Sequence, residues 1–289
     1  MKFAMLQKTL CGAKEFAYRL RRQKASFFGF LSAMTLVAVS VFAPFITRYD
    51  PTEMNSDETL LPPSLKHPFG SDELGRDVLT RIIYGGRISL FVSLTAVAIA
   101  LAVGIPGGLI SGYYSNSLID HVIMRLTDIL LAFPFILLAL VVVVMLGRGM
   151  VNVAIALGIA YSPTFVRMMR GSVLSEKEKE YVEAAKSIGM RRISILLGEI
   201  FPNSIAPVVV IASQTIAYAI LAEAALSFLG LGTMPPQPSW GLMISSGRTF
   251  LQIASWISIF PGLFCAITSL SFAIFGDGLN TMMNPKLRK

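Results

Sequence analysis

The stretch SEKEKEYVEAAKSIGMRRISILLGEIFPN, from Ser175 to Asn203, is the only long charged block between two strongly apolar segments in the second half of the chain. Ser175, with Glu178 three residues later, predicts a capping box that opens a helix. Gly189 stands where a left-handed residue would end that helix. A second short helix is predicted from apolar residues at three- and four-residue spacing, namely Ile193, Leu196, Leu197 and Ile200. Pro202 is expected to stop this helix, so the stretch predicts a helix–turn–helix between two apolar segments.

The composition around this block is that of a membrane protein. Of 289 residues, 54% are hydrophobic and only 15% are charged, and the mean hydropathy is +0.66. These values exclude an ordinary soluble globular domain. The formal net charge is +8, but the basic residues are spread over separate loops, so we expect no nucleic-acid partner. Two cysteines, Cys11 and Cys265, do not make a disulfide framework.

Apolar runs long enough to cross a bilayer predict an all-α integral membrane protein with six transmembrane helices. The first run is too long for the core of a signal peptide and no A-x-A site closes it, so we expect it to remain uncleaved. Tails at 1–25 and 277–289 flank the spans, and a polar segment at 47–87 follows the first one. The predicted spans are residues 26–46 and, within a five-helix core over 88–276, residues 88–112, 127–147, 151–169, 205–232 and 256–275.

The distribution of lysine and arginine predicts the orientation of these spans. Six spans put both tails on one side of the membrane, together with the 113–126 connection and the block at 170–204. With Arg167 just before the block, that side carries 18 of the 25 Lys and Arg residues. Because basic loops stay in the cytoplasm, both termini and the helix–turn–helix are expected to be cytoplasmic. Residues 47–87 and 233–255 are then extracytoplasmic.

The longest polar stretch contains the string HPFGSDELGRD, residues 67–77. A lone histidine near aspartates could mark a metal site, but no second histidine lies nearby and no metal is expected. Turns at the two glycines are the favoured interpretation. We also expect Asp77 to pair with Arg81 along a helix at four-residue spacing.

Two further features lie inside the predicted spans. Gly104, Gly108 and Gly112 recur every four residues, the spacing at which transmembrane helices pack closely. Glu223 is an ionisable group in the fifth span and is expected to face the bundle interior and to hydrogen-bond there, either to a neighbouring span or to a partner chain. Its role is either structural or that of a titrating group in a stand-alone proton-coupled transporter. The second interpretation is less favoured because the chain shows no two-half repeat.

Four separated motifs resemble one family. Glu183-Ala184-Ala185, Gly189 and Ile200-Phe201-Pro202 are similar to the EAA loop of permease subunits in ATP-binding-cassette (ABC) importers, with Phe201 in place of the usual leucine. Three other motifs resemble the C-type permease of the peptide/nickel branch. These are the 67–77 string, the strings AEAALSFLGLG at 222–232 and Pro236-x-Pro238-Ser239-Trp240-Gly241, and the tail motifs at 276–279 and 284–288.

The resemblance implies a type I ABC importer permease fold with a cytoplasmic coupling helix that docks on a separate ATPase. It places the outer-loop residues Pro236, Pro238 and Trp240 near the outer gate or a docking binding protein, where the Trp240 ring suits an interface. ATPase-coupling roles are implied for Glu183, Ala184, Ala185, Ile188, Gly189 and Arg192.

The resemblance also implies a pore subunit of the inner membrane with no catalytic residue, metal or cofactor of its own, while ATP and Mg bind partner ATPases. The implied partners are a homologous B-type permease, two ATP-binding subunits, an extracytoplasmic solute-binding protein and membrane lipid. The expected cargo is a di- or oligopeptide, with nickel or another small solute as the alternative. An intramembrane enzyme is disfavoured because no H-E-x-x-H occurs and His67 and His121 fall on opposite sides of the membrane.

Overall fold

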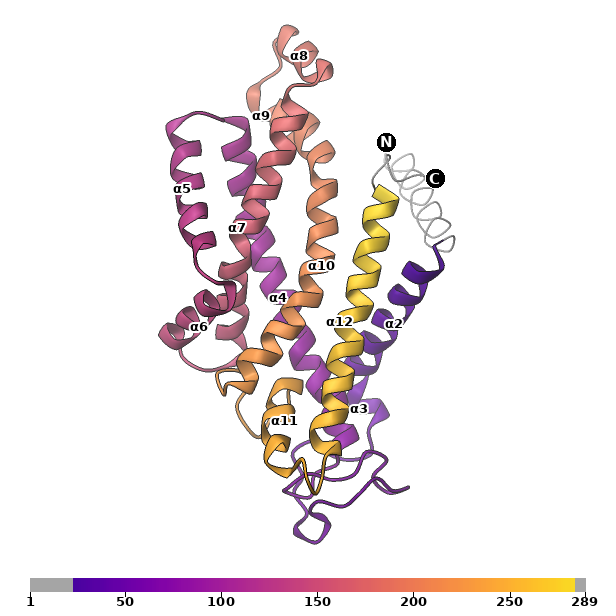
Figure 1. The fold of residues 1–289 in the computed structure, drawn as a ribbon. Coiled ribbons are helices and arrows are strands. Elements are labelled where there is room, and N and C mark those ends of the chain that lie inside the picture. Colours follow the sequence, from indigo (N-terminus) through magenta and orange to yellow (C-terminus); the bar gives the residue numbers. More distant parts are fainter. Residues whose placement is uncertain (1–22, 284–289) are drawn as a thin grey trace.

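A computed structural model describes residues 23–283, and its regular elements over that range are all helical (Figure 1). Five helices are long and apolar enough to cross a membrane, and a sixth span results if one bent helix pair is counted. The tail motif at 284–288 and most of the 1–25 tail lie outside the described residues. The helices are α2 (Lys24–Val41), α3 (Ala43–Ile46), η1 (Ser56–Glu58), α4 (Val78–Tyr113), α5 (Leu118–Ala132), α6 (Phe135–Leu146), α7 (Met150–Lys177), α8 (Glu180–Ser187), α9 (Arg192–Ser194), η2 (Ile195–Ile200), α10 (Phe201–Phe228), α11 (Trp240–Gly247), η3 (Arg248–Phe250) and α12 (Trp256–Met283).

The centre of the molecule is the pairing of α4 with α7, and glycines make the close approach possible. A Cβ atom added to Gly108 would lie 2.5 Å from the Cβ of Met169, and one added to Gly112 would lie 2.7 Å from the Cβ of Val173. Gly104 meets Phe165 in the same way. The predicted packing role of these three glycines is confirmed.

The third span, predicted over 127–147, is not one continuous helix. The chain instead forms α5 and α6, which meet at an angle of 97°. Phe133, just before Pro134, is extended (φ −84°, ψ 139°), because a proline disfavours helical backbone in the residue that precedes it. Pro134 therefore breaks the span.

The boundaries around the charged block also differ from the prediction. α7 runs on through Ser175 to Lys177, so the predicted capping box does not form, and α8 begins instead after Lys179, whose side chain makes no capping hydrogen bond. Pro202 does not stop the second helix. It lies in the first turn of α10, where a missing N–H is tolerated. As a result, α9, the π-helical turn η2 and α10 form one span-length helix over Arg192–Phe228.

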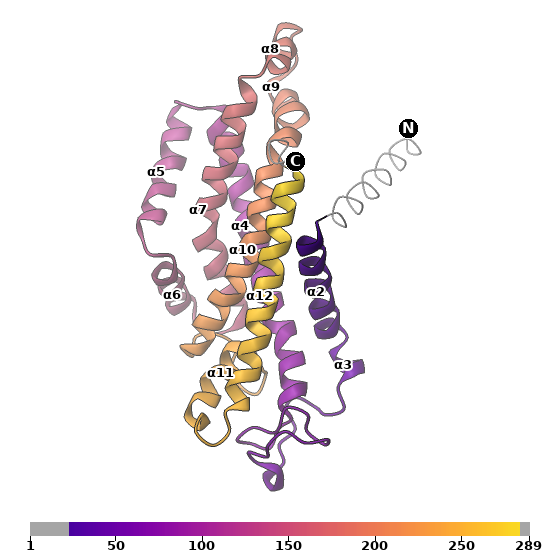
Figure 2. The same ribbon diagram turned by 45° about the vertical axis from the view of Figure 1, so that its right-hand side comes forward.

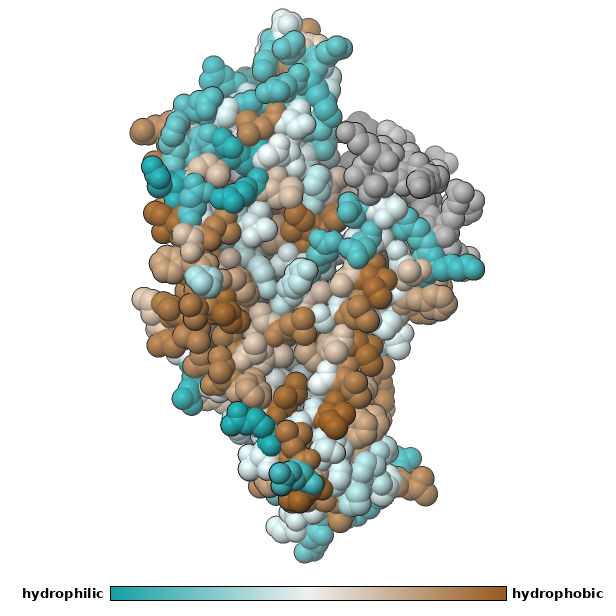
Figure 3. Space-filling model, in the orientation of Figure 1, coloured by the Kyte–Doolittle hydropathy of each residue, from teal (hydrophilic) through white to brown (hydrophobic). Residues whose placement is uncertain are grey.

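The two ends of the molecule are distinct in Figures 1 and 2, with α8 at one end and the 47–77 segment and α11 at the other. An apolar belt lies between two polar ends on the face shown in Figure 3.

α4 begins at Val78, ten residues before the predicted span, and α12 runs beyond the predicted 256–275 to Met283. The 233–255 segment was predicted as a loop but contains the short helix α11. α2 packs beside α12 (Figure 2).

Candidate coupling, cap and intramembrane sites

The hairpin at 179–200 projects from one end of the molecule and is closed by Gly189. Gly189 adopts φ +78°, a left-handed conformation that glycine reaches without steric cost. Its N–H donates to the Lys186 carbonyl at 3.0 Å, and the Met190 N–H donates to the Ala185 carbonyl at 3.1 Å. These two bonds form a Schellman motif. The predicted helix end at Gly189 is confirmed.

The two faces of α8 have different surroundings. Val182 and Ala185 are buried in the same apolar cluster as Ile195, Leu196 and Ile200. Ala185 is thus packed inside its own chain, so the expectation that it faces a partner is wrong. The other residues for which a coupling role is implied are exposed, namely Glu183, Ala184, Ile188, Gly189 and Arg192.

Ile188 is the most prominent apolar side chain of the exposed face, with 78% of its surface accessible. The predicted apolar face of the second helix is only half confirmed. Leu196 and Ile200 are buried, whereas Ile193 and Leu197 are exposed. Three apolar side chains of the hairpin, Ile188, Ile193 and Leu197, are therefore exposed.

A polar cluster joins the base of the hairpin to the two long helices. The Tyr181 hydroxyl donates to Glu176 at 2.8 Å, and the Asn203 amide donates to the same hydroxyl at 3.4 Å. Burial raises the pKa of Tyr181 to about 12, and the hydrogen bond to Glu176 adds to this. The phenol therefore stays neutral and holds the end of α7 to the start of α10.

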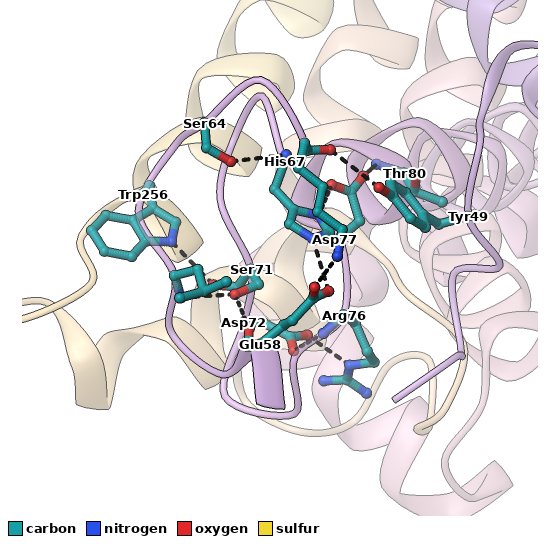
Figure 4. Close-up of polar contacts among 12 residues, drawn as sticks. Tyr49, Glu58, Ser64, His67, Ser71, Asp72, Arg76, Asp77, Thr80 and Trp256 are labelled. Atoms are coloured by element: carbon teal, nitrogen blue, oxygen red, sulfur yellow. Dashed lines mark hydrogen bonds and ion pairs between the residues drawn. The ribbon is translucent and has the colours of Figure 1, made fainter. Parts of the chain in front are cut away.

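At the opposite end, residues 47–77 form a cap over the start of α4, and a buried histidine organises it (Figure 4). His67 Nδ1 lies 2.8 Å from Asp77 Oδ1, and Nε2 lies 3.1 Å from Glu58 Oε2. The second oxygen of Asp77 accepts the Thr80 N–H at 2.8 Å and so caps α4. His67 therefore clamps the cap onto the helix start. Within 23–283 no group of three or more potential metal ligands forms.

The predicted pairing of Asp77 with Arg81 is wrong, because the Asp77 carboxylate binds His67 and the Thr80 N–H at the start of α4. Arg81 Nε instead lies 3.3 Å from Asp72 Oδ2, and its Nη1 donates to the Pro51 carbonyl at 2.7 Å. Asp72 also binds Arg76 Nε at 2.6 Å. The Arg81 contacts hold the cap to α4, and the Asp72–Arg76 pair joins two residues within the cap by a charge-assisted hydrogen bond.

Glu58 adds a surface ion pair to the cap. Its carboxylate accepts from Lys66 and faces His67. The hydrogen bond from Lys66, and then that from His67, lower the pKa of Glu58. Glu58 therefore remains ionised to a lower pH than a free glutamate does.

The Trp240 ring lies inside the molecule, so the prediction of an interfacial anchor or a docking residue is wrong. Only 1% of Trp240 is exposed, and its Nε1 donates to the Ile82 carbonyl at 3.0 Å. Ser239 caps α11 by accepting the Leu242 N–H at 3.3 Å. Pro238 is buried and Pro236 is exposed. Trp240 thus fixes α11 against α4, a role that sequence spacing does not reveal.

Glu223 is buried in α10, as predicted, but the hydrogen bond expected to a neighbouring span or a partner chain forms within its own helix. Its Oε1 accepts from the Ser227 hydroxyl at 2.6 Å. Its Oε2 has no hydrogen-bond partner among the described residues. The partner that sequence could not name is therefore a serine one turn later in the same helix.

Two ion pairs inside the spanning helices were missed by sequence reasoning. Arg170 binds Asp120 through two hydrogen bonds of 2.8 Å each, from Nε and Nη2. Arg167 Nη2 donates to Asp128 Oδ1 at 2.6 Å. The available signal was the presence of a charged residue within or beside each of two apolar runs, since such residues in a membrane need partners.

Spanning helices packed around a central pair, charges paired within them and a hairpin projecting at one end define a membrane-embedded transport permease. A family model described as the inner membrane component of binding-protein-dependent transport systems matches residues 104–289, and the chain belongs to this family. A second model, for the N-terminal transmembrane domain of oligopeptide transport permease C, matches residues 13–63. The chain is therefore a multi-pass membrane component of a transport system rather than an enzyme.

Individual relatives agree with this assignment. The dipeptide transport system permease protein of Alkalihalophilus pseudofirmus is 43% identical over 93% of this chain and 88% of its own length. The di/tripeptide transport system permease of Pseudomonas aeruginosa is 40% identical over 95% of this chain and 92% of its own length. The glutathione transport system permease protein of Pectobacterium atrosepticum is 40% identical over 95% and 91%.

A solved structure shows the same fold at low sequence identity. A chain of the MetNI methionine ABC transporter, in an inward-facing conformation, matches with a TM-score of 0.59 and 16% identity. The match covers 71% of this chain and 96% of that one. The predicted ABC importer permease fold is confirmed.

Proposed function

We propose that the chain is the permease subunit of an ATP-driven importer of di- or oligopeptides and forms one half of the translocation path. The cargo assignment rests on relatives at about 40% identity that are named for dipeptide, di/tripeptide and glutathione transport. The nickel alternative draws no support from these names. Both termini and the hairpin lie in the cytoplasm in this proposal, following the distribution of basic residues.

The observation that carries the mechanism is the projecting hairpin with exposed Ala184 and Ile188. Here it serves as the coupling helix and docks on a separate ATPase subunit, to which ATP and Mg bind. The remaining partners are a second, homologous permease, a second ATPase and an extracytoplasmic solute-binding protein. Since the base of the hairpin is hydrogen-bonded to α7 and α10, movement of the ATPases is passed to the spans. Glu223 has a structural role.

The test is ATP-driven uptake of dialanine by the complete complex in proteoliposomes, comparing Gly189→Ala with Gly198→Ala. A Cβ atom at either position meets no atom within 4 Å, but only Gly189 has a positive φ. The strain at Gly189 costs roughly 1–2 kcal/mol and mis-aims the hairpin. We expect Gly189→Ala to lower uptake and ATPase co-purification, and Gly198→Ala to leave both unchanged. Dialanine uptake without any ATPase subunit would contradict the proposed function.

A further inference from the structure

The ion pair between Arg167 of α7 and Asp128 of α5 is unusual for its exposure. Nη2 and Oδ1 are 2.6 Å apart, yet 56% of the arginine side chain and 53% of the aspartate side chain are accessible. Both residues lie in helices that meet the length and apolarity of membrane spans, alone or as part of the bent pair. Charged side chains at such positions face a water-filled cavity or the bundle interior, because contact with lipid is too costly.

A cavity lies beside Arg167, and Asp128 adjoins it only through its ion pair with this arginine. Its volume is about 620 Å³, and it is walled by α5, α7 and α10. Arg167 lines it directly, and Glu176 and Asn203 place its other end at the base of the hairpin. The wall is apolar at Leu131, Met168 and Pro207 and carries hydroxyls at Thr164, Ser172 and Ser175. A volume of this size, mostly apolar with a few polar groups, suits a small organic molecule.

The neighbouring arginine provides a useful contrast. Arg170 is held by both oxygens of Asp120, which is buried and also accepts from Ser111 and from the Asn116 N–H. These four hydrogen bonds occupy both oxygens of the Asp120 carboxylate, so the Arg170–Asp120 pair fixes α5 against α7. Arg167 has one hydrogen bond, to Asp128. Its remaining N–H donors are available to a ligand.

We propose that Arg167 and Asp128 form a cargo-facing site that binds the charged ends of a short peptide on its way through the path. A peptide with free termini carries an ammonium and a carboxylate. Asp128 can accept from the ammonium while Arg167 donates to the carboxylate in bidentate fashion. The exchange leaves each charge paired with an opposite charge. This inference rests on the proposed peptide-import function.

The experiment uses the complete complex in proteoliposomes with saturating dialanine-loaded binding protein. Arg167→Gln and Asp128→Asn each remove one charge-assisted contact, so dialanine uptake per ATP hydrolysed is expected to fall by about tenfold. ATP hydrolysis itself should stay close to the wild-type rate, because neither residue belongs to the hairpin. The exchange variant D128R/R167D again offers both charges, and we expect it to recover part of the uptake.

Arg148→Gln is the matched control, since Arg148 is an exposed arginine just before α7 that does not line the cavity. It should leave uptake unchanged. Wild-type uptake in both single variants would overturn the inference while leaving the proposed function intact. Loss of the second permease on purification, with no recovery in the exchange variant, would also overturn it and make the pair a subunit contact. If the wild-type complex imported no peptide, the proposed function itself would fail.

Discussion

At the scale of single residues, Ala184 and Ala185 lie on different faces of α8, so their roles can be separated experimentally. Ala184 is exposed, whereas Ala185 packs on the second helix of the hairpin. Ala184→Trp is expected to leave the chain stable but to weaken ATPase docking by about ten- to a hundredfold, because overpacking a close contact costs roughly 1–3 kcal/mol. Ala185→Trp should instead destabilise the hairpin itself. ATPase co-purification together with protease sensitivity at 179–200 distinguishes the two variants, and identical behaviour would contradict the assigned faces.

Glu58 is expected to make the cap sensitive to acid. Its pKa is lowered in the folded state by Lys66 and then by His67, so its contribution to cap stability is complete above the pKa of a free glutamate, about 4.3. That contribution is lost as the pH falls through the lower, folded-state pKa. Proteolysis of residues 47–77 should therefore increase below about pH 4. Glu58→Gln should raise proteolysis at neutral pH and reduce its pH dependence. An unchanged pH profile in Glu58→Gln would argue against this role.

At the scale of helices, α4 and α7 make the most extensive helix–helix contact among the described residues. Gly108→Leu would drive a side chain into Met169 and the backbone of α7, and overpacking of this kind costs roughly 1–3 kcal/mol or more. We expect a lower melting temperature for the purified chain in detergent. Gly262→Leu in α12 is the control, since a Cβ there meets nothing within 4 Å. Equal melting temperatures for the two variants would contradict the packing role of the glycine repeat.

At the scale of the whole molecule, the cap and the hairpin are at opposite ends (Figure 1), which gives a direct test of orientation. Single cysteines at Ser56 and Lys179, in a chain with its own cysteines removed, should react differently with an impermeant thiol reagent. We expect labelling from outside at Ser56 and labelling at Lys179 only after the membrane is opened. The reverse pattern would invert the proposed orientation.

The fold class and the family motifs were predictable from sequence because they depend on local patterns. Apolar runs predict the spans. Gly189 predicts the helix end because the residue after a helix often adopts a left-handed backbone, which glycine favours. The break at Pro134 and the continuation through Pro202 depend on where each helix begins relative to its proline, which an apolar run alone does not encode. The hydrogen-bond partners of His67 and Trp240 belong to other segments of the chain. The partner of Glu223 is one of the chain's many serines. For this reason, sequence could place these side chains near a site without naming their contacts.

The continuity of α9, η2 and α10 has a mechanical consequence. The helix from Arg192 to Phe228 contains 37 residues, and a rise of 1.5 Å per residue makes it about 55 Å long. Such a rod acts as a lever. A tilt of about 10° at the hairpin would displace the far end by about 10 Å over that length, which is comparable to the width of a helix. A small rotation imposed at one face of the membrane thus becomes a large displacement at the other, beside α11 and the buried Trp240.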